Sequence, residues 1–138
     1  MGLRCDVLIV EDDYDIREVL TEVLQDEGYE VSGAANGREA LDLLHRLIAA
    51  GRSQDEGNND VGPRLILLDL MMPVMSGWQF VAEQRQTPEI KDIPVVVVSA
   101  DGNLQQKATS LGASGYLRKP IEIDALLNIV SRYCNKER

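Results

Sequence analysis

The sequence predicts an α/β fold built on a doubly wound, five-stranded parallel sheet, with residues 1–138 forming one domain. Five short apolar segments alternate with stretches in which apolar residues recur every three or four positions, the pattern of amphipathic helices. The short segments are apolar on both faces, as strands are when helices cover both sides of a parallel sheet. Units that alternate in this way imply right-handed crossovers between parallel strands.

The first strand is expected over residues 5–11, followed by a helix with an apolar stripe. Asp15, with Glu18 three residues later, has the spacing of a capping box in which Asp15 is the N-cap. Gly28 suits the stop after this helix, because glycine tolerates the left-handed conformation found there. The second strand is then predicted over residues 29–34.

The second helix is predicted to begin at Asn36, which can cap it, and to run to about Ala50. Residues 51–63 hold one strongly apolar residue among glycine, acidic and amide residues. This composition predicts a flexible, extended loop. The third strand follows over residues 64–69.

The third helix is predicted to open at Ser76-Gly77 and to end before Pro88, with the fourth strand over residues 93–99. Trp78 is interpreted as a packing residue of this helix. One side of the helix is expected to carry Trp78, Val81, Ala82 and Arg85.

The last elements are a short helix that begins at Asn103 and stops at Gly112, a strand over residues 115–118, and a helix over residues 122–136. The closing helix has the clearest amphipathic pattern. Its inward residues are expected to be Ile123, Leu126, Leu127, Val130 and Cys134.

Bulk properties exclude several classes of protein. No segment approaches the roughly 20 apolar residues of a membrane span, and no signal-peptide pattern opens the chain. The net charge of −9 argues against direct nucleic-acid binding, which needs basic surface. Cys5 and Cys134 lack metal-ligand spacing and are interpreted as reduced thiols of a cytoplasmic protein. The single histidine, His45, is interpreted as an ordinary helix residue.

Polar side chains follow the predicted strands at their carboxyl ends. In a doubly wound sheet, ligands bind beyond these ends, so we expect the side chains to converge. The converging residues are Glu11, Asp12, Asp69, Ser99 and Lys119.

Three carboxylates in one place require a cation, because like charges so close cannot all remain ionised unaided. Mg²⁺ prefers oxygen ligands, and Lys119 and Ser99 suit the oxygens of a phosphoryl group. This set predicts phosphoryl transfer with Asp69 as the nucleophile. Glycine-rich nucleotide motifs are absent from the sequence, so the phosphodonor need not be a tightly held nucleotide.

These motifs, taken together and in order, resemble those of the response-regulator receiver domain of two-component signalling. The resemblance covers about residues 4–136 and implies a flavodoxin-like (βα)5 sheet with strand order 2-1-3-4-5. The matching segments are Val10-Glu11-Asp12-Asp13, Leu67-Leu68-Asp69-Leu70-Met71-Met72-Pro73 with Gly77, Val98-Ser99-Ala100, and Gly115-Tyr116-Leu117-Arg118-Lys119-Pro120.

The resemblance implies that Asp69 is the phosphoacceptor. Asp12, Asp69 and the backbone carbonyl of Met71 would ligate Mg²⁺, and Glu11 would act mainly through water. Asp13 is interpreted as a solvated residue before the first helix.

The resemblance also assigns the remaining site residues. Lys119 would pair with the phosphoryl group, and Ser99 would move to hydrogen-bond it. Tyr116 would rotate into the space that Ser99 leaves, and the bond between Lys119 and Pro120 is expected to be cis. Met71 and Asp101 flank the site and are expected to tune hydrolysis of the acyl phosphate.

A histidine kinase or a histidine phosphotransfer protein is the implied phosphodonor. A downstream protein target, or a second copy of the chain, would bind the face formed by the fourth helix, fifth strand and fifth helix. The chain is expected to be a stand-alone receiver or an excised domain. Two departures from the family are the serine at position 99, where threonine is commoner, and the long segment 51–63.

Two other functions remain open at this point. A metal-dependent phosphatase also uses an aspartate after a strand, but a second aspartate commonly follows two residues later, where this chain has Met71. A receiver-like adaptor with a silent site is the third interpretation, and the presence of every key side chain counts against it.

Overall fold

The computed structural model describes residues 6–54 and 62–134, and its strands form one parallel sheet. The strand order is β2-β1-β3-β4-β5, as predicted. The strands are β1 (Val7–Val10), β2 (Val31–Ala34), β3 (Leu65–Asp69), β4 (Val95–Ser99) and β5 (Gly115–Arg118). The helices are α1 (Tyr14–Asp26), α2 (Gly37–Gln54), α3 (Gly77–Arg85), α4 (Leu104–Leu111) and α5 (Ile123–Tyr133).

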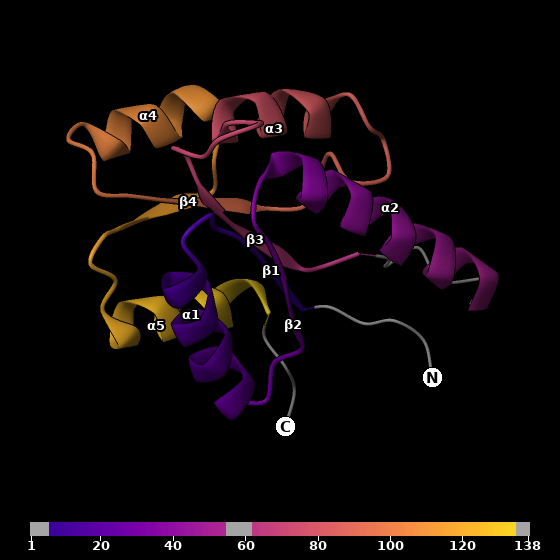
Figure 1. Ribbon diagram of the computed structural model, residues 1–138, viewed down its shortest axis with the longest axis horizontal. Helices are drawn as coiled ribbons and strands as arrows, with labels where there is room; N and C mark the ends of the chain where they lie inside the picture. The colour runs from indigo at the N-terminus through magenta and orange to yellow at the C-terminus, as the bar shows by residue number, and fades with distance from the viewer. Residues whose placement is uncertain (1–5, 55–61, 135–138) are drawn as a thin grey trace.

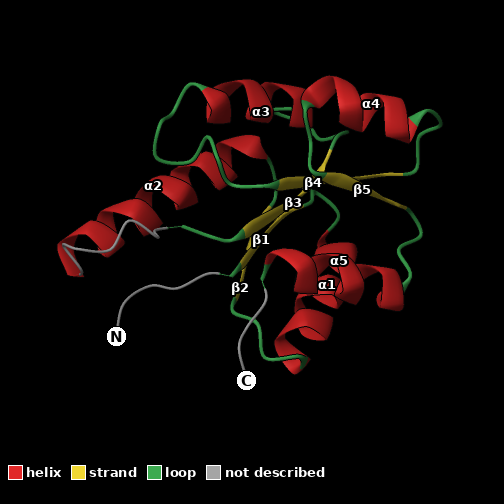
Figure 2. Ribbon diagram, turned by 180° about the vertical axis from the view of Figure 1, so that it is seen from behind, coloured by secondary structure: helices red, strands yellow, loops and turns green. Residues whose placement is uncertain are grey.

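The sheet lies between two layers of helices (Figures 1 and 2). Helices α1 and α5 cover one face, and α2, α3 and α4 cover the other. Successive strand side chains point to opposite faces, so β1 sends Leu8 and Val10 toward α2–α4, and Val7 and Ile9 toward α1 and α5. The two faces thereby form two separate hydrophobic clusters, and the central strands are buried on both sides.

The register aligns the carboxyl ends of the inner strands. Val10 of β1 lies opposite Leu68 of β3, and Asp69 lies opposite Val98 of β4. The residues just after β1 and at the end of β3 are therefore neighbours at one edge of the sheet.

The N-cap of α1 is Asp13, so the prediction that Asp15 caps this helix is wrong. The Asp13 side chain accepts a hydrogen bond from the amide of Ile16 at 3.2 Å. Asp15 lies within the first turn, where its negative charge suits the helix dipole. Asp13 is exposed, as interpreted, but the description of it as a solvated residue is incomplete because it also caps α1.

Other caps follow the prediction. Gly28 has a φ of 94° directly after the end of α1. Asn36 accepts a hydrogen bond from the amide of Glu39 at 2.9 Å, which begins α2. Helix α2 runs on to Gln54, so the predicted loop over residues 51–63 begins too early, and residues 55–61 lie outside the described part of the chain.

The buried face of α3 shares only Val81 with the predicted side. Its buried residues are Gly77, Phe80, Val81 and Gln84, whereas Trp78 is 41% exposed and Ala82 and Arg85 are exposed. The reason lies at the start of the helix, where Ser76 caps the amide of Gln79 and Gly77 lies against the end of β3. This contact sets the rotation of the helix.

The closing helix buries Leu126 and Val130, as predicted, and Cys134 is buried just beyond it. Ile123 was expected to point inward, but it is 53% exposed in the first turn. The Cys134 thiol donates to the carbonyl oxygen of Asp6 at 3.4 Å, and Cys5 lies outside the described residues. Within residues 6–54 and 62–134, no helix has the length and apolar character needed to cross a bilayer.

Candidate functional site

The carboxylates of Glu11, Asp12 and Asp69, called the acidic cluster below, meet at the carboxyl ends of β1 and β3. Each of them offers an oxygen, and these oxygens all lie within 4.8 Å of one another. Glu11 and Asp69 are buried, whereas Asp12 is exposed. The acidic cluster is thus half enclosed by protein and open to solvent through Asp12.

Lys119 is the cation that faces the acidic cluster. Its Nζ lies 2.9 Å from Oε1 of Glu11 and 3.4 Å from Oδ2 of Asp69. The chain after β5 brings it there, because the Lys119 amide donates to the carbonyl of Ser99 at 3.0 Å. The peptide bond between Lys119 and Pro120 is cis, as predicted.

Backbone amides orient two of the carboxylates. The Met71 amide donates to Oδ1 of Asp69 at 3.1 Å, and the Asp13 amide donates to Oε2 of Glu11 at 3.1 Å. Each of these carboxylates therefore has one oxygen on a backbone amide and one toward Lys119. The Met71 side chain is 64% exposed, beside the mouth of the site.

The electrostatics of the site favour a bound cation. Burial raises the pKa of Asp69 to about 7, with the neighbouring Glu11 carboxylate adding to the rise and the Met71 amide and Lys119 opposing it. Burial acts to lower the pKa of Lys119, but its contacts with Glu11 and Asp69 outweigh this and raise it. Ionising Asp69 beside Glu11 is therefore costly, and a dication among three carboxylate oxygens would relieve that cost.

Ser99, at the end of β4, is buried, and its hydroxyl is engaged locally. Its Oγ accepts a hydrogen bond from the Asp101 amide at 3.1 Å. Asp101 is in turn held by two cations: Lys107 lies 2.9 Å from its carboxylate, and Arg118 donates to its carbonyl at 2.9 Å. The β4–α4 turn is therefore tied to both α4 and β5.

Tyr116 lies on β5 and is 39% exposed. Ser99 pairs in register with Arg118, two residues beyond Tyr116. The predicted switch pair thus comes from neighbouring strands, with the serine buried and the tyrosine exposed.

The absence of a side chain at Gly77 contributes to the site, and this role was not predicted from the sequence. A Cβ at this position would lie 2.9 Å from the carbonyl oxygen of Asp69 and 2.9 Å from Cα of Leu70. The glycine therefore lets α3 close onto the residue that carries the central carboxylate. Its place eight residues after Asp69, directly after a capping serine, was the available sequence signal.

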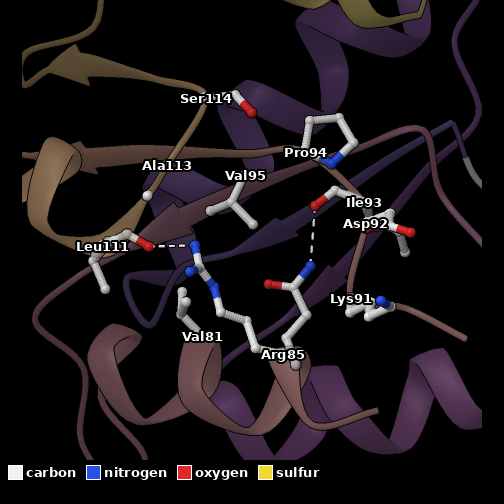
Figure 3. Close-up of a pocket in the computed structure, with 12 residues that line it drawn as sticks. Val81, Arg85, Lys91, Asp92, Ile93, Pro94, Val95, Leu111, Ala113 and Ser114 are labelled. Atoms are coloured by element: carbon white, nitrogen blue, oxygen red, sulfur yellow. Dashed lines mark hydrogen bonds between the residues drawn. The ribbon is translucent and has the colours of Figure 1, made fainter. Parts of the chain in front are cut away.

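A separate cavity of about 320 Å³ lies between α3 and the start of β4 (Figure 3). Arg85 reaches across it to the carbonyl of Leu111, and buried Gln84 donates to the carbonyl of Ile93 at 3.0 Å. None of the predicted site residues lines it. It lies at the amino ends of the strands, and the acidic cluster lies at their carboxyl ends.

Comparisons with known proteins agree with this geometry. A sequence profile of the response regulator receiver domain matches residues 7–131. The sporulation initiation phosphotransferase F of Bacillus subtilis is 34% identical, over 92% of this chain and 91% of that protein. The response regulator MprA of Mycolicibacterium vanbaalenii is 36% identical over 88% of this chain, which spans about half (46%) of that protein.

Solved structures show the same architecture. The chemotaxis protein CheY4 of Vibrio cholerae matches with a TM-score of 0.72 and 32% identity, covering 95% of this chain and 99% of that one. A putative response regulator from Chloroflexus aurantiacus matches with a TM-score of 0.78 and 29% identity, covering 97% and 100%. With five parallel strands in the order 2-1-3-4-5 and an acidic cluster at their carboxyl ends, this chain belongs to the response regulator receiver domain family of two-component signalling.

Proposed function

We propose that Asp69 is the residue that accepts a phosphoryl group from a phosphohistidine. The observation that carries the proposal is the position of its buried carboxylate, which shares the acidic cluster with Glu11 and Asp12 and lies 3.4 Å from Lys119. In the transfer, an Asp69 carboxylate oxygen forms a bond to phosphorus as the bond from phosphorus to the imidazole nitrogen breaks. Lys119 faces the oxygens that gain negative charge in this step.

The acidic cluster fits Mg²⁺, which is the cofactor we propose. Its donors are all carboxylate oxygens. Burial and then the Glu11 carboxylate raise the pKa of Asp69, and a dication would relieve this cost of ionisation. Asp12, Asp69 and the Met71 carbonyl would hold the ion, and Glu11 would act mainly through water. When bound, Mg²⁺ supplies charge neutralisation at the phosphoryl oxygens.

The phosphoryl group would act on the β4–α4 turn through Ser99. The Ser99 hydroxyl, which now accepts from the Asp101 amide, would turn to donate to a phosphoryl oxygen. Tyr116, now outside, would follow inward, and the face of α4, β5 and α5 would change for a downstream protein. A ligand shifts such an equilibrium only by its different affinity for the two states, and here the inward hydroxyl supplies that difference.

Receiver domains act between histidine kinases and downstream effectors. A histidine kinase or a histidine phosphotransfer protein in the cytoplasm would dock beside α1 and the site. The α4–β5–α5 face would bind a protein target or a second copy of this chain, without direct contact to nucleic acid. The domain would assist its own phosphorylation and dephosphorylation and would not turn over a separate substrate.

Incubation with acetyl phosphate and Mg²⁺, followed by intact-mass measurement, tests the proposal. The wild-type chain should gain one phosphoryl group, and Asp69→Asn should gain none. Asp92→Asn, which removes an exposed aspartate beside the distant cavity, is the matched control and should behave as the wild type. An equal gain in Asp69→Asn, or steady turnover of p-nitrophenyl phosphate at rates typical of enzymes, would overturn it.

A further inference from the structure

We infer that Arg17 of α1 is a positioning residue that fixes the main chain of Glu11 and so sets the affinity of the acidic cluster for a divalent cation. The inference rests on the proposed Mg²⁺ site. It concerns a residue outside the cluster that acts through the backbone and contributes no ligand.

The main contact is a hydrogen bond to the residue that follows β1. Nη1 of Arg17, a charged donor, donates to the carbonyl oxygen of Glu11 at 2.6 Å. On the other side of the same residue, the Glu11 amide donates to the carbonyl of Ala34 at 3.0 Å. Both backbone polar groups of Glu11 are therefore occupied, which fixes the direction in which its side chain leaves the strand.

The guanidinium is held in place from two further sides. It lies over the exposed ring of Tyr14, 5.5 Å from the ring centre. Its methylene stem lies against Gly33 of the edge strand β2, where a Cβ would be 3.1 Å from Cδ and 3.4 Å from Cγ of Arg17. Because Gly33 has no side chain, the Arg17 stem can pack directly against the backbone of β2.

Arg17 and Lys119 place positive charge near the cluster in different ways. Lys119 pairs directly with carboxylate oxygens of Glu11 and Asp69, so it competes with a cation for them. Arg17 bonds the backbone carbonyl of Glu11 and leaves those oxygens available. It can thus preorganise the cluster and reduce its repulsion without competing for the metal ligands.

The test measures binding of the metal alone, by Mg²⁺ calorimetry and by Mn²⁺ titration followed by electron paramagnetic resonance. Arg17→Met should weaken binding of both ions about tenfold, as loss of a residue outside the ligand set does in other metal sites. Arg17→Lys, which keeps a donor and a charge, should recover part of the loss. Arg132→Met, which removes an exposed arginine in the last turn of α5, is the matched charge control and should bind as the wild type.

A second variant displaces the Arg17 side chain without removing its charge. Gly33→Val should crowd the Arg17 stem and weaken binding in the same direction, and it should add nothing in the Arg17→Met background, since neighbours that act through one contact are not additive. If Arg17→Met does not fold, the single variant Gly33→Val tests the inference in its place.

The outcomes separate this inference from the proposed function. If Arg17→Met and Gly33→Val both bind Mg²⁺ and Mn²⁺ as the wild type does, the positioning role is refuted while the metal site stands. Equal weakening in Arg132→Met would also refute it, because net charge alone would then explain the loss. If the wild type binds neither ion, the proposed function itself fails.

Discussion

At the scale of single residues, the buried carboxylate of Asp69 is costly to ionise. Its pKa is raised from an ordinary value of 3.8 to about 7, first by burial and then by Glu11. The folded protein therefore binds a proton here that the unfolded chain has already released. Above pH 4 this difference in proton binding progressively lowers the free energy of unfolding, until the folded form also ionises near pH 7.

Metal-free wild type should accordingly lose stability as the pH rises from about 4 to about 7. Asp69→Asn, which cannot ionise, should lack this component. It should exceed the wild type at pH 8 by on the order of 2 kcal/mol, given about 1.4 kcal/mol for each unit of pKa shift and the loss of the contact with Lys119. Urea unfolding at several pH values measures the difference. A gap that stays constant from pH 5 to pH 8 would contradict this account.

Sequence reasoning could bring the acidic residues and Lys119 together but could not predict this energetic feature. The spacing of Glu11, Asp12, Asp69 and Lys119 at strand ends follows from chain order and parallel topology alone. The degree of burial depends on how α3 closes over β3, and periodicity does not contain that information. The contact of Arg17 with the Glu11 carbonyl could not be predicted from the sequence either, because a backbone partner leaves no residue-type signature.

At the scale of elements, the sequence pattern predicted the existence of α3 but not which of its residues are buried. Its apolar residues are few and do not gather clearly on one side of the helix. The close approach of Gly77 to Asp69 selects the rotation that buries Phe80 and Gln84 and exposes Trp78. Strands were more predictable because their uninterrupted apolar runs suit a sheet covered on both faces.

Gly77→Ala should therefore destabilise the fold by roughly 1–3 kcal/mol, since its methyl group would meet backbone atoms of Asp69 and Leu70 that cannot move independently. Thermal or urea unfolding measures the loss. Gly102→Ala is a suitable control, because a Cβ at that exposed position meets nothing within 4 Å. Equal losses in the two variants would show that general glycine effects, and not the contact with β3, are responsible.

The end of α4 depends on a second glycine. Gly112 has a φ of 73°, and a Cβ there would lie 2.5 Å from the guanidinium of Arg85, which bonds the Leu111 carbonyl. Gly112→Ala should cost about 2 kcal/mol, part from the left-handed backbone and part from the displaced Arg85. In the Arg85→Met background the cost should fall to about 1 kcal/mol, because only the backbone part remains. A double-mutant cycle on unfolding free energies measures this coupling, and a zero coupling energy would contradict it.

At the scale of the whole molecule, the net charge of −9 opposes compactness, and the acidic cluster concentrates part of that charge. Raising NaCl should stabilise wild type and Asp12→Asn alike through screening. Mg²⁺ at matched ionic strength should give the wild type a further increase that follows the logarithm of ion concentration, and should give Asp12→Asn much less. Unfolding midpoints across both titrations measure the two contributions. Equal responses of the two proteins to Mg²⁺ would assign its effect to screening alone.

The exposed side chain of Trp78 has a practical consequence for work on partners. It is the one tryptophan of the chain, and it lies in the first turn of α3, next to the glycine that touches Asp69. Its indole emission, and its accessibility to a soluble quencher such as iodide, should therefore report when another protein covers this end of the sheet. Docking kinetics can be followed optically on the unlabelled chain, with no dye attached.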